Sequence, residues 1–202
     1  MKTFLIDLDK TLYKPQTGIF EEINNNIEKF MVKYLNLQKE FIESLRLHYV
    51  KTYGSTLMGL MKNYNVDPYV FLDFAHSVDL STIKSNNIIK EKLKSLKGRK
   101  VIFTSAPKKH ALNVLDRLEV LNEFDDIFDI IEAEFIAKPN KEPYIKVIQK
   151  FPSKLYTMID DMEQNLITAK LFNFKTILVN KNKSDQVDLC VESFEEIPLE
   201  FL

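Results

Sequence analysis

The chain has 202 residues, and its 28 Lys and Arg against 29 Asp and Glu leave a formal net charge of -1, which does not favour a nucleic acid polymer as a partner. Its four glycines cannot form a GxGxxG dinucleotide motif, and Gly54 and Gly59 are not followed by the Lys and Ser/Thr of a P-loop. A lone cysteine, Cys190, excludes an intrachain disulfide and CxxC sites; because no segment reads as a signal peptide or a membrane span, we expect a cytoplasmic protein without a membrane partner.

The first predicted element is a buried strand over residues 4–8, an apolar run that Asp7 interrupts. After it, from about residue 13 to residue 97, almost every pattern is helical. Apolar residues at spacings of three and four predict an amphipathic helix over residues 19–34, and a similar pattern covers 37–50. Asp67 and Pro68 are typical of an N-cap and a first helical residue, and they predict a helix that runs towards His76. A long helical segment therefore follows the first strand.

The rest of the chain alternates strands with helices. Short apolar runs predict strands at residues 101–103, 155–159 and 176–179, and helical patterns lie between them at 110–118, 141–150 and 163–172. This alternation is typical of a parallel sheet in an α/β layered fold. The pattern alone thus predicts an α/β core with a helical insertion after its first strand.

Two pairs of carboxylates lie at the ends of two predicted strands. Asp7 and Asp9 end the first strand, and Asp160 and Asp161 follow the strand at 155–159. Because alternate residues of a strand point to the same side, we expect Asp7 and Asp9 to share the carboxyl edge, where parallel sheets bind ligands. Buried like charges repel, and a hard cation such as Mg²⁺ would relieve that repulsion because it prefers oxygen ligands. The alternative for the first pair is a strand that simply runs into an acidic loop.

Two weaker signals fit the same edge. The strand at 101–103 runs into Thr104 and Ser105, whose hydroxyls can donate to phosphate oxygens, and Lys138 stands before Pro139 in an extended context. Taken singly, the hydroxyl pair also fits a helix start and the lysine fits a surface charge. Together with the acidic pairs, these residues predict a site for a metal ion and a phosphate group.

The order and spacing of these motifs resemble the haloacid dehalogenase superfamily. The features that carry the resemblance are DxDxT from Asp7 to Thr11, a helical insertion, a hydrophobic residue before Thr104, Lys138 before Pro139, and Asp160-Asp161. Within that superfamily the chain is similar to the pyrimidine 5'-nucleotidase group, through IDLDKTLY at 6–13, YGSTLxGL at 53–60 and FTxAxKxHA at 103–111. The resemblance implies a Rossmann-like parallel-sheet core of residues 1–13 and 98–202, with residues 14–97 as an inserted helical cap domain.

The resemblance further implies a Mg²⁺-dependent phosphatase that acts through an aspartyl-phosphate. Asp7 would be the nucleophile, and Asp9 would protonate the departing alkoxide and then deprotonate the hydrolytic water. Thr104 and Lys138 would hold the phosphoryl oxygens as charge spreads over them. Asp9 also argues against dehalogenation, because that reaction has no alkoxide to protonate. The residues expected at the metal site are Asp7, Asp9, Asp160 and Asp161, and those expected to bind substrate are Thr11, Ser105, Tyr53 and Thr56.

A nucleoside 5'-monophosphate, pyrimidine before purine, is the substrate that the resemblance implies. Two alternatives stay open: another small phosphorylated metabolite, and a catalytically silent protein of the same fold that only holds a metal or a partner. Some residues depart from the family's pattern. Lys10 replaces the usual asparagine or glycine, Ser105 replaces the usual asparagine, and Glu119 and Asn173 stand where glycine is frequent. No pattern in the sequence predicts the oligomeric state.

Overall fold

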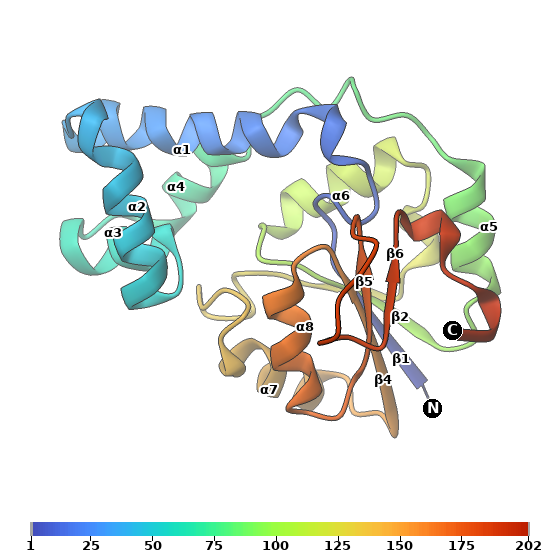
Figure 1. Ribbon diagram of the computed structural model, residues 1–202. Coiled ribbons are helices and arrows are strands. Elements are labelled where there is room, and N and C mark those ends of the chain that lie inside the picture. The colour runs from blue at the N-terminus through green and yellow to red at the C-terminus, as the bar shows by residue number, and fades with distance from the viewer. Residues whose placement is uncertain (1, 202) are drawn as a thin grey trace.

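The computed structural model describes residues 2–201, and within them a parallel sheet of six strands runs in the order β3-β2-β1-β4-β5-β6 (Figure 1). The strands are β1 (Lys2–Ile6), β2 (Arg99–Phe103), β3 (Asp126–Phe128), β4 (Leu155–Asp160), β5 (Lys175–Val179) and β6 (Leu189–Val191). β1 lies inside the sheet, with Ile6 paired to Ile102 of β2 and to Ile159 of β4. Because the strands are parallel, the residues that follow β1, β2 and β4 meet at one edge.

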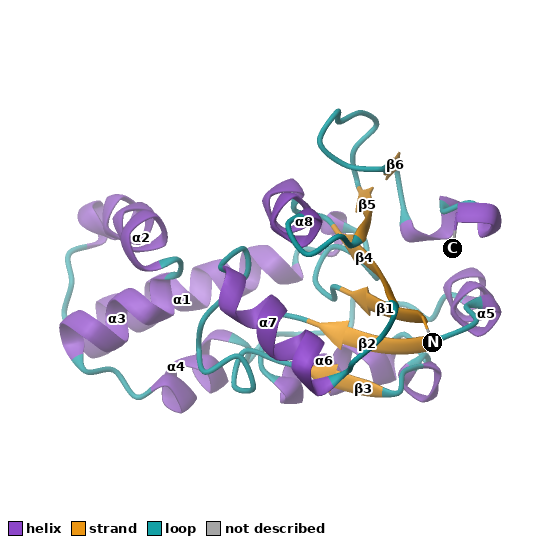
Figure 2. Ribbon diagram, turned by 90° about the horizontal axis from the view of Figure 1, so that it is seen from below, coloured by secondary structure: helices purple, strands orange, loops and turns teal. Residues whose placement is uncertain are grey.

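Helices cover both faces of the sheet, which gives three layers (Figure 2). On one face Ile6 and Ile102 belong to a buried cluster with α5 and α6, and on the other Leu5 belongs to a cluster with α7 and α8. Because successive residues of a strand are buried on opposite faces of the sheet, the inner strands read as continuous apolar runs. The helices are α1 (Ile19–Leu35), α2 (Lys39–Tyr53), α3 (Thr56–Tyr64), α4 (Pro68–Ala75), α5 (Asn87–Ser95), α6 (Lys108–Arg117), α7 (Lys141–Lys150) and α8 (Glu163–Lys170), with short 3-10 turns at Pro15–Thr17, Leu121–Glu123, Phe194–Glu196 and Leu199–Phe201.

Helices α1 to α4 form a bundle beside the sheet, at the left of Figure 1. Their buried cluster is separate from the two clusters of the sheet and includes Phe30, Ile42, Leu60 and Phe71, one residue from each helix. The start of α4 is as expected, because the Asp67 side chain accepts hydrogen bonds from the backbone amides of Tyr69 and Val70. The insertion therefore packs around an apolar cluster distinct from those of the sheet, to which Ile130 of the core also contributes.

The motif at residues 53–60 has a clear structural basis in this bundle. Gly54 ends α2 with φ of 83°, a left-handed conformation that glycine adopts without strain. Gly59 lies on α3, where an added Cβ would stand 2.2 Å from the Tyr49 ring of α2. Gly59 thus lets α2 and α3 pack closely and Gly54 lets the chain turn between them, so this part of the motif shapes the cap.

The proposed division into a core (1–13 and 98–202) and a cap (14–97) remains a prediction. The structure adds one observation on its second boundary. Ile83 and, in α5, Ile89 and Leu93 pack in the same cluster as the sheet residues, and α5 lies beside the core in Figure 1. These contacts favour a boundary before residue 83, with α5 counted as part of the core layer.

Most predicted elements are found near their expected positions, but two strands and two helices were not expected. The unexpected elements are β3, β6, α3 and α5. The two strands have three residues each, too few to give a periodic pattern. The predicted first strand was too long at its end, because β1 stops at Ile6 and Asp7 already lies beyond it.

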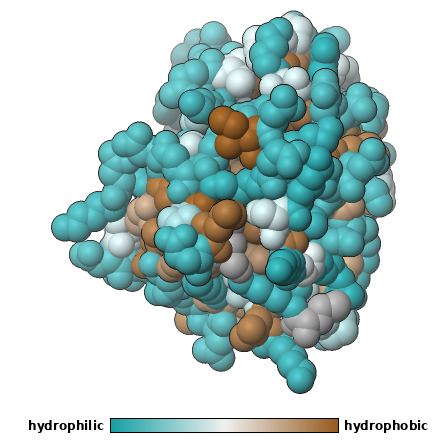
Figure 3. Space-filling model, turned by 90° about the vertical axis from the view of Figure 1, so that its right-hand side faces the viewer, coloured by the Kyte–Doolittle hydropathy of each residue, from teal (hydrophilic) through white to brown (hydrophobic). Residues whose placement is uncertain are grey.

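The surface over α5 and the C-terminal segment is mostly hydrophilic, with hydrophobic residues in small separate groups (Figure 3). Among the described helices, none combines the length and the apolar composition needed to cross a membrane.

Candidate active site

Two acidic segments meet where β1 and β4 end. Asp7 follows β1, and its backbone amide donates to the Ile159 carbonyl of β4 at 2.9 Å, so the two strand ends are tied together. Asp160 is the last residue of β4, and Asp161 follows it. In open α/β sheets this place, where the strand order reverses, is the usual ligand-binding position. Asp7 of the first acidic pair thus lies beside Asp160 and Asp161 of the second.

Lys138 lies between the two acidic segments and forms an ion pair with each of them. Its Nζ lies 2.8 Å from Asp7 Oδ1 and 2.8 Å from Asp160 Oδ2, and it also donates to the Phe103 carbonyl at 2.7 Å. The lysine side chain is only 2% exposed. Burial alone would lower the pKa of Lys138, but the charges of Asp160 and Asp7 outweigh it and raise that pKa. Lys138 is therefore a fixed cation at the centre of the site.

Asp7, Asp160 and Asp161 form a cluster that fits a hard metal ion. One carboxylate oxygen from each lies within 4.8 Å of the others. Burial raises the pKa of Asp7, and the charges of Asp160 and Asp161 raise it further, against the lowering effect of Lys138. Burial and the Asp160 charge also raise the pKa of Asp161. The three carboxylates thus repel one another, and their all-oxygen donors suit Mg²⁺.

Asn165 of α8 supports this cluster and was not expected from the sequence. Its Nδ2 donates to both oxygens of Asp160, at 2.9 and 3.0 Å, and the amide of Met162 donates to Asp160 Oδ1 at 2.8 Å. Asn165 Oδ1 is buried and has no hydrogen-bond partner among the described residues. Because a buried acceptor without a donor is costly, this oxygen is suited to accept from a water molecule bound at the site.

Asp9 lies in a different environment. Its Oδ1 accepts from the Tyr13 hydroxyl at 2.6 Å and lies 2.8 Å from His110 Nε2 of α6. Burial would raise the pKa of Asp9, but the hydrogen bond and charge of His110 and the hydrogen bond of Tyr13 outweigh it, so the pKa lies below its usual value. Asp7 and Asp9 therefore have opposite pKa shifts. The two carboxyls thus lie in different electrostatic environments.

The predicted hydroxyl residues lie around these carboxylates. Thr11 donates from Oγ1 to Asp7 Oδ2 at 3.0 Å. Thr104 Oγ1 accepts from the amide of Ala106 at 3.0 Å, which leaves its hydroxyl proton for another acceptor. Ser105 Oγ accepts from the backbone amide of Lys138 at 3.3 Å. Thr104 and Ser105 also line the cavity described next.

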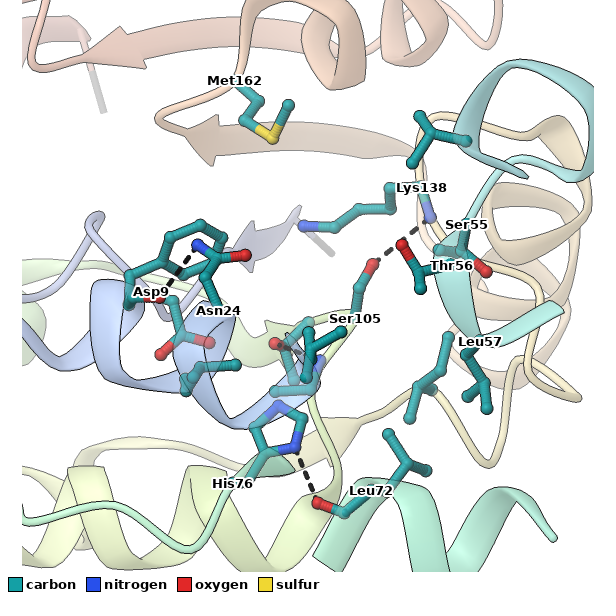
Figure 4. A pocket seen from close by; sticks show the side chains of 18 of the residues that line it. Asp9, Asn24, Ser55, Thr56, Leu57, Leu72, His76, Ser105, Lys138 and Met162 are labelled. Carbon is teal, nitrogen blue, oxygen red and sulfur yellow. Dashed lines mark hydrogen bonds between the residues drawn. The ribbon is translucent and has the colours of Figure 1, made fainter. Parts of the chain in front are cut away.

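A cavity of about 300 Å³ separates these residues from the cap. Figure 4 shows Asp9, Ser105 and Lys138 of the core together with Asn24, Ser55 and Thr56 of the cap around it. Tyr53, expected to bind substrate, is not among the cavity-lining residues, and its ring packs 5.8 Å from that of Tyr49. The lining residues from the cap are mainly apolar, with Arg46 as their one cation among the described residues: Phe20, Ile23, Asn24, Ile27, Arg46, Val50, Gly54, Ser55, Thr56, Leu57, Phe71, Leu72 and His76.

Lys10, which departs from the family's pattern, contacts both halves of the molecule. It has φ of 61°, the left-handed conformation that explains why asparagine or glycine is usual there. Its Nζ lies 2.7 Å from Asp161 Oδ2 and 4.3 Å from the centre of the Phe20 ring of α1. Glu119 and Asn173 have the same left-handed conformation, with φ of 58° each, which explains why glycine is frequent at their positions. Lys10 thus adds a second cation to the acidic cluster.

Fold and site together define an α/β enzyme with an acidic centre under a helical cap, and the comparisons with known proteins agree. Residues 1–173 match the model of the haloacid dehalogenase-like hydrolases. The chain therefore belongs to this family, and the predictions of the fold and of an enzyme of this family are confirmed. The pyrimidine 5'-nucleotidase subgroup stays a prediction.

One curated relative and two solved structures illustrate what the chain is similar to. The chain is 28% identical over 234 residues to Phosphate metabolism protein 8 of Saccharomyces cerevisiae, with 98% of this chain and 72% of that protein covered. Its fold is similar to that of YfnB, a HAD-hydrolase of Bacillus subtilis bound to magnesium, with a TM-score of 0.62, 16% identity and 96% of each chain covered. A protein of Clostridium acetobutylicum described as a predicted phosphatase gives a TM-score of 0.60 and 23% identity, over 96% of this chain and 95% of that one.

Proposed function

We propose that this chain hydrolyses small phosphate monoesters with the help of Mg²⁺, and that its substrate is a nucleoside 5'-monophosphate, pyrimidine in preference to purine. One observation carries the reaction: the Asp7 carboxylate, held by Lys138 at 2.8 Å, lines a cavity and belongs to a cluster of three carboxylates. A nucleophile beside a fixed cation and a metal site is what phosphoryl transfer needs.

In the proposed reaction, the Asp7 carboxylate attacks phosphorus and the bond from phosphorus to the ester oxygen breaks. Asp9 gives its proton to the departing alkoxide, which leaves as an alcohol. A water molecule then attacks the aspartyl-phosphate at phosphorus and passes a proton to Asp9, so that phosphate leaves and both carboxyls are restored. Thr104 and Lys138 donate to the phosphoryl oxygens in both steps.

Mg²⁺ bound by Asp7, Asp160 and Asp161 would supply positive charge for the phosphoryl oxygens and keep the Asp7 carboxylate ionised. Asp9, the fourth residue of the expected metal site, is not part of this three-carboxylate cluster. Its side chain is instead free of the cluster for the proton transfers of the reaction.

The cap supports a nucleoside as the leaving group. Cap residues give the cavity an apolar lining, from Phe20, Val50 and Phe71, together with polar groups from Asn24 and Arg46. Such a lining suits a flat ring that carries polar edges. The preference for pyrimidines rests on the motifs at residues 6–13, 53–60 and 103–111, which resemble the nucleotidase group.

A panel of phosphate esters assayed with Mg²⁺ and with EDTA tests this function. We expect turnover of uridine and cytidine 5'-monophosphate above that of sugar phosphates, loss of turnover in EDTA, and recovery when Mg²⁺ is restored. Equal turnover of sugar phosphates and nucleotides would favour another small phosphorylated metabolite as substrate. If no ester is hydrolysed in Mg²⁺, the silent binding protein is the better account.

A further inference from the structure

Two donors converge on a single oxygen of Asp9. The Tyr13 hydroxyl donates to Oδ1 at 2.6 Å, and His110 Nε2 lies 2.8 Å from the same atom. His110 and Tyr13 are buried, with His110 1% exposed, and Asp9 is 13% exposed. No hydrogen bond to Asp9 Oδ2 is found among the described residues. The carboxyl thus has one occupied oxygen and one oxygen left for the cavity that Asp9 lines.

We propose that His110, together with Tyr13, is a positioning residue that holds Asp9 by Oδ1 and presents Oδ2 to the leaving group. This inference rests on the proposed function. The Tyr13 hydroxyl has a proton to donate and a carboxylate oxygen can only accept, so both contacts are donations to Oδ1. Because Oδ1 already accepts two hydrogen bonds, the proton that Asp9 passes to the alkoxide is carried on Oδ2.

The two donors come from different parts of the core, so they fix the plane of the carboxyl. Tyr13 follows Asp9 by four residues in the segment after β1, whereas His110 lies in the first turn of α6. A carboxyl held from two directions cannot rotate about its last side-chain bond without breaking a charge-assisted hydrogen bond. Correct orientation of a catalytic group is a large part of its contribution to rate.

The cap closes this arrangement from the other side. His76, which follows α4, packs with its ring centre 5.0 Å from that of His110 and lines the same cavity as Asp9. His76 Nδ1 lies 2.9 Å from the Leu72 carbonyl, which can only accept, so Nδ1 donates and the ring is fixed (Figure 4). His76 thereby packs against the His110 ring beside its contact with Asp9.

The test compares two esters that differ in how much they need a proton. Phenyl phosphate has a poor leaving group that depends on the acid, while 4-nitrophenyl phosphate has a good one that depends on it less. The measured quantity is kcat/KM, which reports the steps up to release of the alcohol. Because the leaving groups have similar shapes, substrate binding in the cap is nearly matched.

We expect His110→Phe and Tyr13→Phe to lower kcat/KM for phenyl phosphate by about 10- to 100-fold, and for 4-nitrophenyl phosphate by less than about 3-fold. His110→Gln, whose amide nitrogen can still donate near Oδ1, should retain most of the phenyl phosphate activity. His48→Phe, on the exposed side of α2, is the matched control and should leave both values unchanged.

Equal losses for both esters in Tyr13→Phe and His110→Phe, or no loss for either ester in these two variants, would overturn the inference. If His110→Phe does not fold, Tyr13→Phe and His110→Gln still decide the question, since they keep the size of the side chain close to the original. A wild-type protein that hydrolyses neither ester in Mg²⁺ contradicts the proposed function and this inference with it. Hydrolysis of both esters by the wild type with no selective loss contradicts the inference alone.

Discussion

Replacing Asp7 by Asn should abolish hydrolysis of phosphate esters, with kcat lower by about 10⁴-fold or more, while the protein stays folded. The amide keeps the shape of the side chain but cannot attack phosphorus. It also removes one of the buried carboxylates that repel each other in the cluster, and Lys138 keeps Asp160 as its partner, so the free energy of unfolding should not fall greatly. Steady-state kinetics and circular dichroism of the purified variant check both parts.

Asp185→Asn is the control for this variant, because Asp185 is exposed and is not among the residues that line the cavity. Its kinetics should equal those of the wild type. Wild-type turnover in Asp7→Asn would show that another group is the nucleophile, or that water attacks the ester directly.

Replacing Lys138 by Met should have the largest effect on stability. The lysine is 2% exposed and lies 2.8 Å from both Asp7 and Asp160, so its loss leaves two buried carboxylates without their cation. Breaking a buried ion pair in this way costs about 3–5 kcal/mol in the free energy of unfolding. Urea unfolding in EDTA measures this cost without compensation from a bound metal ion.

A second change distinguishes charge from packing. In Lys138→Met with Asp160→Asn, one of the unpaired carboxylates is gone, and at least about 1 kcal/mol of the lost stability should return. Lys109→Met removes an ion pair with Asp73 in which both side chains are largely exposed, and it should change stability by less than about 1 kcal/mol. If the double variant is less stable than Lys138→Met, the loss comes from packing and not from the uncompensated charge.

The strands and acidic pairs could be predicted because both follow from one property of the sheet. A strand buried on both faces reads as an apolar run, so a carboxylate at its end, such as Asp160, stands out. The short strands β3 and β6 give no such run, since three residues are too few for a pattern. Asp7 and Asp9 line the same cavity as expected, although they follow β1 instead of alternating within it.

The supporting residues of the site could not be predicted, since their roles depend on contacts between distant segments. His110 meets Asp9 across 101 positions of sequence, and a lone histidine in a helical pattern is more often structural. Asn165 is a polar residue on the buried side of α8, a weak signal that gains meaning only beside Asp160. Tyr53, expected to bind substrate, packs on Tyr49 and is not among the residues that line the cavity, so its role stays a prediction.

Trapping the covalent intermediate tests the central claim most directly. The protein is mixed with 4-nitrophenyl phosphate and Mg²⁺, quenched in acid within the first turnover, and digested for mass spectrometry. The account predicts that the peptide containing Asp7 gains the mass of one phosphoryl group, and that the same peptide from Asp7→Asn does not. A phosphoryl group on any other residue, or rapid hydrolysis with no labelled peptide in repeated quenches, would contradict it.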